Sequence, residues 1–322
     1  FQGVSRVVGK QRLTRVLVVL QFALAIILVI GTLAMSRQMD YLQSMNLGFR
    51  QQQIIVLQNR ANDREATLQK LRQALLQHGE ILNVSGAQFS FTSGYHYVGF
   101  EFQGENEQAL ECRVDPYFLE TMDITLVAGR NFSSEITSDR ETAVIVNEKF
   151  VNAFGLENPL GTTFTFRGTP NMQIVGVVKD FNFRDLREPI IPMVMHNNEM
   201  ARLSAIFVRV AQGQTQQALK IMEEQWRKIA PGLPFDFSFL DENLAQQYES
   251  EQRWSTIVHY SSLFAIMVAC LGLFGLAALT MHQRTKEIGI RKTLGATVPG
   301  LVSLVSREFA ILVGLASLVA WP

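Results

Sequence analysis

The sequence is poor in the residues on which disulfide frameworks and nucleic-acid binding depend. It has 322 residues but only two cysteines, Cys112 in a polar region and Cys270 inside an apolar run, so we expect no disulfide between them. Its 29 basic and 29 acidic side chains cancel, which excludes a global attraction to nucleic acid. Charged residues make up 18% of the chain, below the roughly 25% of ordinary soluble domains.

The sequence also lacks the common catalytic and nucleotide-binding motifs. It has no G-x-x-x-x-G-K-[ST] loop to hold a phosphate, and no G-x-S-x-G, H-E-x-x-H or C-x-x-C. Its five histidines are scattered without the spacing of metal ligands. Asp180 and Asp185 are candidates for an acid–base pair, but a turn is favoured because no nucleophile or metal ligand accompanies them. We predict a solvated face for the acids Glu101, Glu105, Glu107 and Glu111. No enzyme activity, cofactor or metal is therefore expected.

Long uncharged runs are what the chain has instead. Val16 to Met35 is apolar and uncharged, and about 20 such residues cross the hydrocarbon core of a bilayer. The run is too long for a signal peptide, and no clear A-x-A cleavage site follows it. A second run covers Ile257 to Met281, with Trp254 as an interfacial anchor, and a third begins near Val298. We predict three membrane helices, the third truncated at Pro322.

Basic residues determine the predicted orientation. Residues 1–15 carry four Lys or Arg and no acid, and residues 282–292 carry four with one acid. The positive-inside rule places residues 1–15 and 282–297 in the cytoplasm. Residues 37–253 are then extracytoplasmic.

The extracytoplasmic segment contains one pattern of elements twice. A strand, a helix and a strand are predicted at 54–57, at 64–78 and within 81–91, and again at 203–210, 215–229 and 235–240. Asp63 is the expected cap of the first helix and Gly79 its stop. Two β-α-β units indicate a split ferredoxin-like lobe, about 48–94 and 197–240. Residues about 95–196 are expected to form an inserted, strand-rich α+β lobe. Within it, Asn147 is the expected cap of a helix from Glu148 to Phe154, and Thr163 to Phe166 is an expected strand.

Helical stripes extend beyond both membrane spans. The first continues through Met35, Met39, Leu42 and Met45. Leu244 and Tyr248 precede the second span, on a segment that Asp241 would cap. We predict two stalk helices, 37–46 and 241–253.

The segment from Arg284 to Ala296 separates the second and third apolar runs. As a helix it would place Ile290 and Leu294 on one face and pair Glu287 with Arg291. Gly289 would cost such a helix about 1 kcal/mol relative to alanine, which indicates a bend or a close approach by another molecule. The alternative is a basic loop that only fixes the membrane topology.

With these features in place, the chain resembles the permeases of the MacB/FtsX-type ABC transporter superfamily over nearly its whole length. The most specific match is Arg284 to Ala296, which is similar to the R-x-x-E-I-G-I-R-[KR]-x-[LI]-G-A signature of that family. Further matches are Leu47-Gly48-Phe49, Val114-Asp115-Pro116-Tyr117-Phe118, Gly129-Arg130-Asn131-Phe132, Val146-Asn147-Glu148, Asn158-Pro159-Leu160-Gly161 and the run Ile174 to Phe181. Gln21-Phe22-Ala23 after a basic leader resembles the C-terminal half of a duplicated permease, so we interpret the chain as a fragment.

The resemblance implies a membrane protein with α-helical transmembrane spans and an α+β extracytoplasmic domain, in a multi-pass bacterial inner-membrane protein. The implied domains are a leader and first span (1–36), a MacB-like core domain (37–253) and an FtsX-like permease domain (254–322). Within the last, the second span is 257–281, the coupling segment 284–297 and the third helix 298–322.

The family resemblance also implies partners. A cytoplasmic ABC-type ATPase would bind the coupling segment, a second permease half or copy would complete the transporter, and an extracytoplasmic adaptor or substrate protein would bind outside. The residues implied for ATPase coupling are Arg284, Lys286, Glu287, Ile288, Gly289, Ile290, Arg291, Lys292, Leu294 and Gly295.

The implied function is ATP-driven movement of the external domain, for export of antimicrobials or peptides or for lipoprotein extraction. Two alternatives stay open at this point. One is a non-transport subunit that signals to a cell-wall hydrolase or a sensor kinase, and the other is a membrane-anchored receptor or scaffold without an ATPase.

Overall fold

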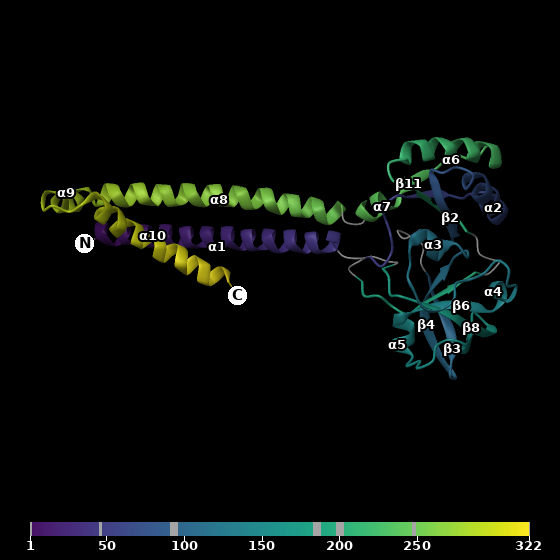
Figure 1. Cartoon of the computed structure of the whole chain (residues 1–322). Helices are drawn as coiled ribbons and strands as arrows, with labels where there is room; N and C mark the ends of the chain where they lie inside the picture. Colours follow the sequence, from purple (N-terminus) through teal and green to yellow (C-terminus); the bar gives the residue numbers. More distant parts are fainter. Residues whose placement is uncertain are drawn as a thin grey trace. The chain divides into compact units, whose positions relative to one another are not determined.

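The computed structural model describes residues 2–44, 47–90, 96–182, 188–197, 203–246 and 249–321 (Figure 1). The chain divides into two compact units. The helical unit combines Phe1–Ser44 with Glu249–Pro322, and the α+β unit is Met45–Tyr248.

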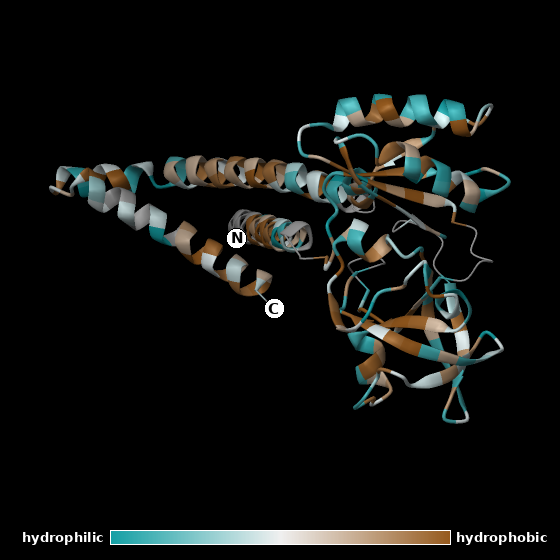
Figure 2. Cartoon of the chain, turned by 45° about the vertical axis from the view of Figure 1, so that its right-hand side comes forward, coloured by the Kyte–Doolittle hydropathy of each residue, from teal (hydrophilic) through white to brown (hydrophobic). Residues whose placement is uncertain are grey.

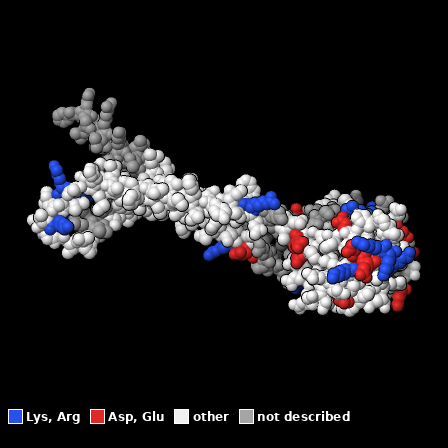
Figure 3. All heavy atoms as spheres, turned by 90° about the horizontal axis from the view of Figure 1, so that it is seen from above, with Lys and Arg blue, Asp and Glu red and all other residues white. Residues whose placement is uncertain are grey.

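The described residues of the helical unit form the helices α1 (Gln2–Ser44), α8 (Glu249–Gln283), α9 (Thr285–Thr293) and α10 (Val298–Ala320). Val16–Tyr41 and Gln252–Gln283 are long and apolar enough to cross a membrane, and Phe309–Ala320 is a shorter apolar stretch. Hydrophobic residues line α8 in Figure 2, and a long stretch of this unit shows no charged side chain in Figure 3. Side chains such as Phe264 and Phe274 are 67% and 73% exposed, which suits helices surrounded by lipid.

Helix α1 packs along α8 and α10. Gly272 of α8 faces Gln21 of α1 so closely that a Cβ at Gly272 would lie 2.6 Å from Gln21 Oε1. The absence of a side chain at Gly272 therefore lets the polar Gln21 side chain fit between the two helices.

The structure agrees with the first predicted stalk segment but not with the second. Helix α1 continues without a break to Ser44, beyond Met35 and Met39, whereas Met45 and Tyr248 lie outside the described residues. The prediction for Leu244 is wrong, because it lies in α7 (Leu240–Gln246) and is buried in the core of the α+β unit. Asp241 is not a cap, since α7 begins one residue earlier.

The split lobe is a four-stranded antiparallel sheet in the order β11-β1-β10-β2. Its strands are β1 (Ile54–Gln58), β2 (Ile81–Ala87), β10 (Ala205–Val210) and β11 (Phe237–Phe239). Helices α2 (Arg64–Leu75) and α6 (Thr215–Ile229) cover one face, where Leu68, Leu71 and Trp226 are buried (Figure 1). The two β-α-β units are thus present as predicted.

Helix α2 has the predicted start but not the predicted end. Asp63 Oδ1 accepts the N–H of Ala66 at 2.9 Å, which confirms the cap. The helix ends at Leu75 instead of at the predicted His78, because the His78 N–H bonds to the Leu75 carbonyl at 3.0 Å and tightens the chain into a turn.

The inserted lobe contains a seven-stranded sheet in the order β5-β8-β6-β9-β4-β3-β7, which the additional β7–β8 pairing closes. Its strands are β3 (His96–Phe102), β4 (Glu105–Arg113), β5 (Leu126–Gly129), β6 (Ala143–Asn147), β7 (Thr163–Phe166), β8 (Thr169–Val178) and β9 (Met193–His196). Short helices α3 (Phe118–Met122), α4 (Ser138–Glu141) and α5 (Glu148–Ala153) lie between them. Phe100, Phe150 and Phe164 meet in its core, with ring centroids 5.3–5.7 Å apart.

One hydrophobic core joins the two lobes. It contains Ile54 and Phe207 from the split sheet together with Leu110 and Phe118 from the inserted lobe. The rings of Phe118 and Phe207 meet edge to face at 5.7 Å. The two lobes therefore form one folded body.

Candidate functional site

The segment predicted to couple to an ATPase is a defined helix, α9. Its C-terminus closes on Gly295, whose φ of +89° suits glycine. The Gly295 N–H bonds to the Lys292 carbonyl at 3.2 Å, and the Ala296 N–H bonds to the Arg291 carbonyl at 3.0 Å. These two bonds form a Schellman motif, which satisfies the last carbonyl groups of the helix.

No residue of α9 is buried within the described part of the chain. Ile290 and the following Leu294 are 62% and 81% exposed. Arg291 Nη2 lies 2.7 Å from Glu287 Oε1, so the predicted ion pair is confirmed. A Cβ at Gly289 would meet nothing within 4 Å among the described atoms.

The predicted coupling residues lie on α9 or directly at its ends. They are Arg284, Lys286, Glu287, Ile288, Gly289, Ile290, Arg291, Lys292, Leu294 and Gly295. Arg284 and Ile288 are half-buried and the others are exposed. Apolar side chains among basic ones on an exposed helix form a surface suited to a partner protein.

A buried carboxylate, Asp115, links the two lobes of the α+β unit. It accepts hydrogen bonds from Arg72 Nη2 of α2, from the Gly86 N–H of β2 at 2.9 Å and from the Tyr117 N–H at 3.1 Å. Burial raises the pKa of Asp115 to about 6, while Arg72 and the two backbone N–H groups act in the opposite direction. The Arg72 guanidinium also stacks over the Tyr117 ring, 4.2 Å from its centroid.

A second buried carboxylate, Glu111, shows that the predicted solvated acidic face is wrong at this position. Glu111 is 3% exposed. Its oxygens lie 2.8 Å from His196 Nε2, 2.9 Å from Arg167 Nη1 and 3.2 Å from Arg113 Nε. Burial raises the pKa of Glu111, but the hydrogen bonds and charges of His196 and Arg167 outweigh it and hold the pKa below the ordinary value. This cluster is internally paired and has a structural role.

Asp180 also has a structural environment. Its Oδ1 accepts the N–H of Lys149 at 2.8 Å near the start of α5, and its own N–H donates to Glu148 Oε2 at 3.2 Å. Asp185 lies outside the described residues. Among the described residues, no group of three His, Cys, Asp or Glu side chains could hold a metal ion.

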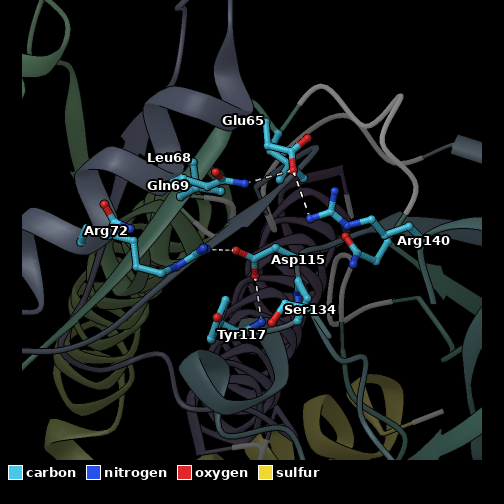
Figure 4. Close-up of a pocket in the computed structure, with 12 residues that line it drawn as sticks. Glu65, Leu68, Gln69, Arg72, Asp115, Tyr117, Ser134 and Arg140 are labelled. Carbon is cyan, nitrogen blue, oxygen red and sulfur yellow. Dashed lines mark hydrogen bonds and ion pairs between the residues drawn. The ribbon is translucent and has the colours of Figure 1, made fainter. Parts of the chain in front are cut away.

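A cavity of about 280 Å³ lies beside Asp115, between α2 and the inserted lobe (Figure 4). Its wall includes Glu65, Arg72 and Arg140 as well as Leu68 and Tyr117. No pattern in the sequence indicates this cavity.

Comparison with known proteins identifies the family. The model of the MacB-like periplasmic core domain matches residues 16–223. The chain belongs to this family. The resemblance to MacB/FtsX-type ABC transporter permeases is confirmed, as is the fold class of apolar membrane helices with an α+β extracytoplasmic domain.

The relatives are distant in sequence. The chain is 23% identical over 188 residues to the macrolide export ATP-binding/permease protein MacB of Aggregatibacter actinomycetemcomitans, covering 56% of this chain and 29% of that protein. It is 21% identical over 227 residues to the uncharacterized ABC transporter permease YknZ of Bacillus subtilis, covering 68% of this chain and 57% of that protein. The chain thus spans less than a third of the length of that MacB protein.

Two solved structures resemble part of the chain. The periplasmic region of MacB from Actinobacillus actinomycetemcomitans is 16% identical with a TM-score of 0.46, covering 63% of this chain and 94% of that one. The extracellular domain of YknZ is 14% identical with a TM-score of 0.43, covering 57% of this chain and 98% of that one.

Proposed function

We propose that this chain couples ATP hydrolysis by a separate cytoplasmic ATPase to movement of its extracytoplasmic domain, and that α9 is the contact with the ATPase. The observation that carries the proposal is a capped helix in which the described structure buries no residue, with Ile290 and the adjoining Leu294 exposed to solvent. Exposed apolar side chains of this size become stabilising once a partner buries them, at about 25 cal/mol per Å².

The charges of α9 define the partner surface. Lys286, Arg291 and Lys292 are exposed on the same short helix as Ile290, so the partner surface is expected to carry acidic residues. Gly289 leaves room for the partner backbone to come close. These features support a docked helix over a loop that only fixes topology.

Chain continuity supports transmission to the outside. Only Arg284 separates α9 from α8, a helix of 35 residues, and its N–H bonds to the Thr280 carbonyl at 3.0 Å. A displacement of α9 would therefore pull directly on α8. Allosteric coupling free energies are typically 1–3 kcal/mol.

The proposed topology places residues 1–15 and 282–297 in the cytoplasm and 37–253 outside a bacterial inner membrane, with domain bounds of 1–36, 37–253 and 254–322. We propose export of antimicrobials or peptides, or extraction of lipoproteins, as the output. The name of the MacB relatives, macrolide export ATP-binding/permease protein, supports export. Further proposed partners are a second permease half or copy and an external adaptor or substrate protein.

The test is co-purification of the full-length permease with its ATPase, followed by ATPase and export assays on the complex. Glu287→Lys breaks the ion pair and reverses a charge, so it is expected to release or uncouple the ATPase. Gly289→Leu should stabilise the helix by roughly 1 kcal/mol, because leucine favours a helix more than glycine does. Its side chain would also fill the open space beside Gly289. If this variant no longer binds the ATPase, the cause is therefore a blocked contact and not an unfolded helix. Glu223→Lys is the matched control, because Glu223 forms an exposed i,i+4 pair with Arg227 in α6.

The outcomes separate the alternatives. Association with an ATPase that both α9 variants abolish, together with ATP-dependent export, supports the proposal. Association without export supports a signalling subunit acting on a cell-wall hydrolase or sensor kinase. If no ATPase associates, the proposed coupling is wrong and a receptor or scaffold is the better account.

A further inference from the structure

The cavity beside Asp115 has the charge pattern of a site for a molecule with two opposite charged ends. One face of α2 supplies Glu65, Leu68, Gln69, Arg72 and Gln73, which recur at helical spacing. Arg140 of α4 and Asp115 line the inserted-lobe side. The described lining thus has two carboxylates and two guanidinium groups, and their charges cancel. A ligand without net charge would keep the site electrically neutral.

Arg72 has donor capacity left for a ligand. Its Nε donates to the Val84 carbonyl at 2.9 Å and its Nη2 donates to Asp115, which fixes the guanidinium. Within the described part of the chain, Nη1 makes no hydrogen bond, so its two N–H groups are available in the cavity wall. A fixed guanidinium with free donors is a preorganised site for a carboxylate.

Glu65 is the corresponding site for a cation. Its Oε1 lies 3.9 Å from Arg140 Nη2, which is too long for a hydrogen bond, and 3.4 Å from Gln69 Nε2 (Figure 4). An ammonium group would therefore make a shorter bond to Glu65 than either protein neighbour does.

The spacing of these two residues along the backbone of α2 sets the length that we expect of the ligand. Glu65 and Arg72 are seven residues apart on α2, which corresponds to about 10 Å along the helix axis. An extended chain of three residues spans about 10 Å. The volume of about 280 Å³ lies near the lower limit of small-ligand pockets, roughly 300–1,000 Å³.

We propose that this cavity binds a short zwitterionic peptide of about three residues, with its ammonium group on Glu65 and its carboxylate on Arg72. Leu68, Pro116 and Tyr117 give apolar contacts to the peptide body, and Gln69 and Ser134 give polar ones. The proposal does not depend on the coupling role of α9, so either can fail alone.

The test is isothermal titration calorimetry on the full-length permease in lipid nanodiscs, with trialanine, N-acetyl-trialanine and trialanine amide. Trialanine is expected to bind, and each blocked peptide to bind about tenfold more weakly or worse, because each loses one charged hydrogen bond. Equal binding of the three peptides, or no binding of trialanine, would overturn the proposal.

A variant assigns the ammonium end. Glu65→Gln alters a side chain that is 39% exposed, so the fold should persist. It should weaken the binding of trialanine about tenfold, and N-acetyl-trialanine should then bind as well as trialanine does. Trialanine amide should still bind more weakly than trialanine. Glu223→Gln, a change of the same kind on α6, should leave all three affinities unchanged. If N-acetylation still weakens binding to the Glu65→Gln variant, Glu65 does not bind the ammonium group and the assignment is refuted.

Discussion

Replacing Glu111 with glutamine should destabilise the inserted lobe although it adds and removes no volume. Glutamine keeps one carbonyl oxygen but loses the charge that faces His196, Arg113 and Arg167. Those side chains then surround an amide that brings donors of its own, which leaves the buried Arg113 guanidinium without a counter-charge.

The magnitude follows from how deeply each partner is buried. His196 and Arg113 have side chains only 6% and 14% exposed, and hydrogen bonds to charged groups are worth about 1.5–3 kcal/mol each. Arg167 is 46% exposed, so solvent screens its contribution to about 0–1 kcal/mol. Since glutamine retains part of one bond, we expect a loss of about 3 kcal/mol, near the lower end of the 3–5 kcal/mol for breaking a buried pair.

Amide hydrogen exchange of β4 and β9 in the full-length protein measures this loss as a local opening free energy. Glu107→Gln, four residues earlier on the same strand and half-buried, is the control and should change it by less than about 0.5 kcal/mol. A Glu111→Gln effect no larger than the control would refute the buried-pair argument.

The same substitution predicts a pH dependence. Because the folded pKa of Glu111 is lowered from 4.5, its stabilisation is complete above about pH 4.5 and is lost as the pH falls through the lowered folded pKa. Wild type and variant should therefore converge in opening free energy only on acidification below about pH 4.5. Convergence at neutral pH would contradict the sign of this shift.

Three further substitutions test the backbone and the helix packing. Gly129→Ala should cost at least about 2 kcal/mol in thermal unfolding, because φ is +77° and the Cβ would lie 2.2 Å from the Val175 carbonyl oxygen. Asn147→Ala removes three hydrogen bonds of a fully buried side chain and should slow refolding or lower stability by about 2–4 kcal/mol in denaturant titration. Gly272→Leu should weaken disulfide cross-linking between cysteines introduced in α1 and α8, whereas Gly272→Ala should be tolerated since the Gln21 amide can move.

Local signals made several elements predictable. The bounds of α6 and of β7 agree with the sequence prediction, because turn residues flank a helical period in the first and a period of two in the second. Asn147 was predicted to cap α5, and its Oδ1 does accept the Phe150 N–H at 3.0 Å. The same side chain also bonds to the Met193 N–H and the Ile191 carbonyl, which no local pattern could indicate.

The missed features depend on residues far apart in sequence. The hairpin of β3 and β4 turns at Gln103 and Gly104, both with positive φ, and its polar composition concealed the strands. Glu111 looked solvated because its partners Arg167 and His196 lie 56 and 85 residues away. Similarly, the cavity needs α4 beside α2, which only the tertiary fold provides. Tertiary pairing, and not propensity, determined each of these sites.

The shared core limits what an ATP-driven movement can do to the α+β unit. Opening the two lobes would expose Ile54, Leu110, Phe118 and Phe207, among others, and each buried side chain of this kind is worth about 1.5–3 kcal/mol. Those four alone would cost roughly 6–12 kcal/mol, and the Arg72 bond to Asp115 would break as well. A typical coupling free energy of 1–3 kcal/mol is too small for that. The proposed transmission must therefore displace the α+β unit as one rigid body, and ligand access to the cavity must not require separation of its lobes.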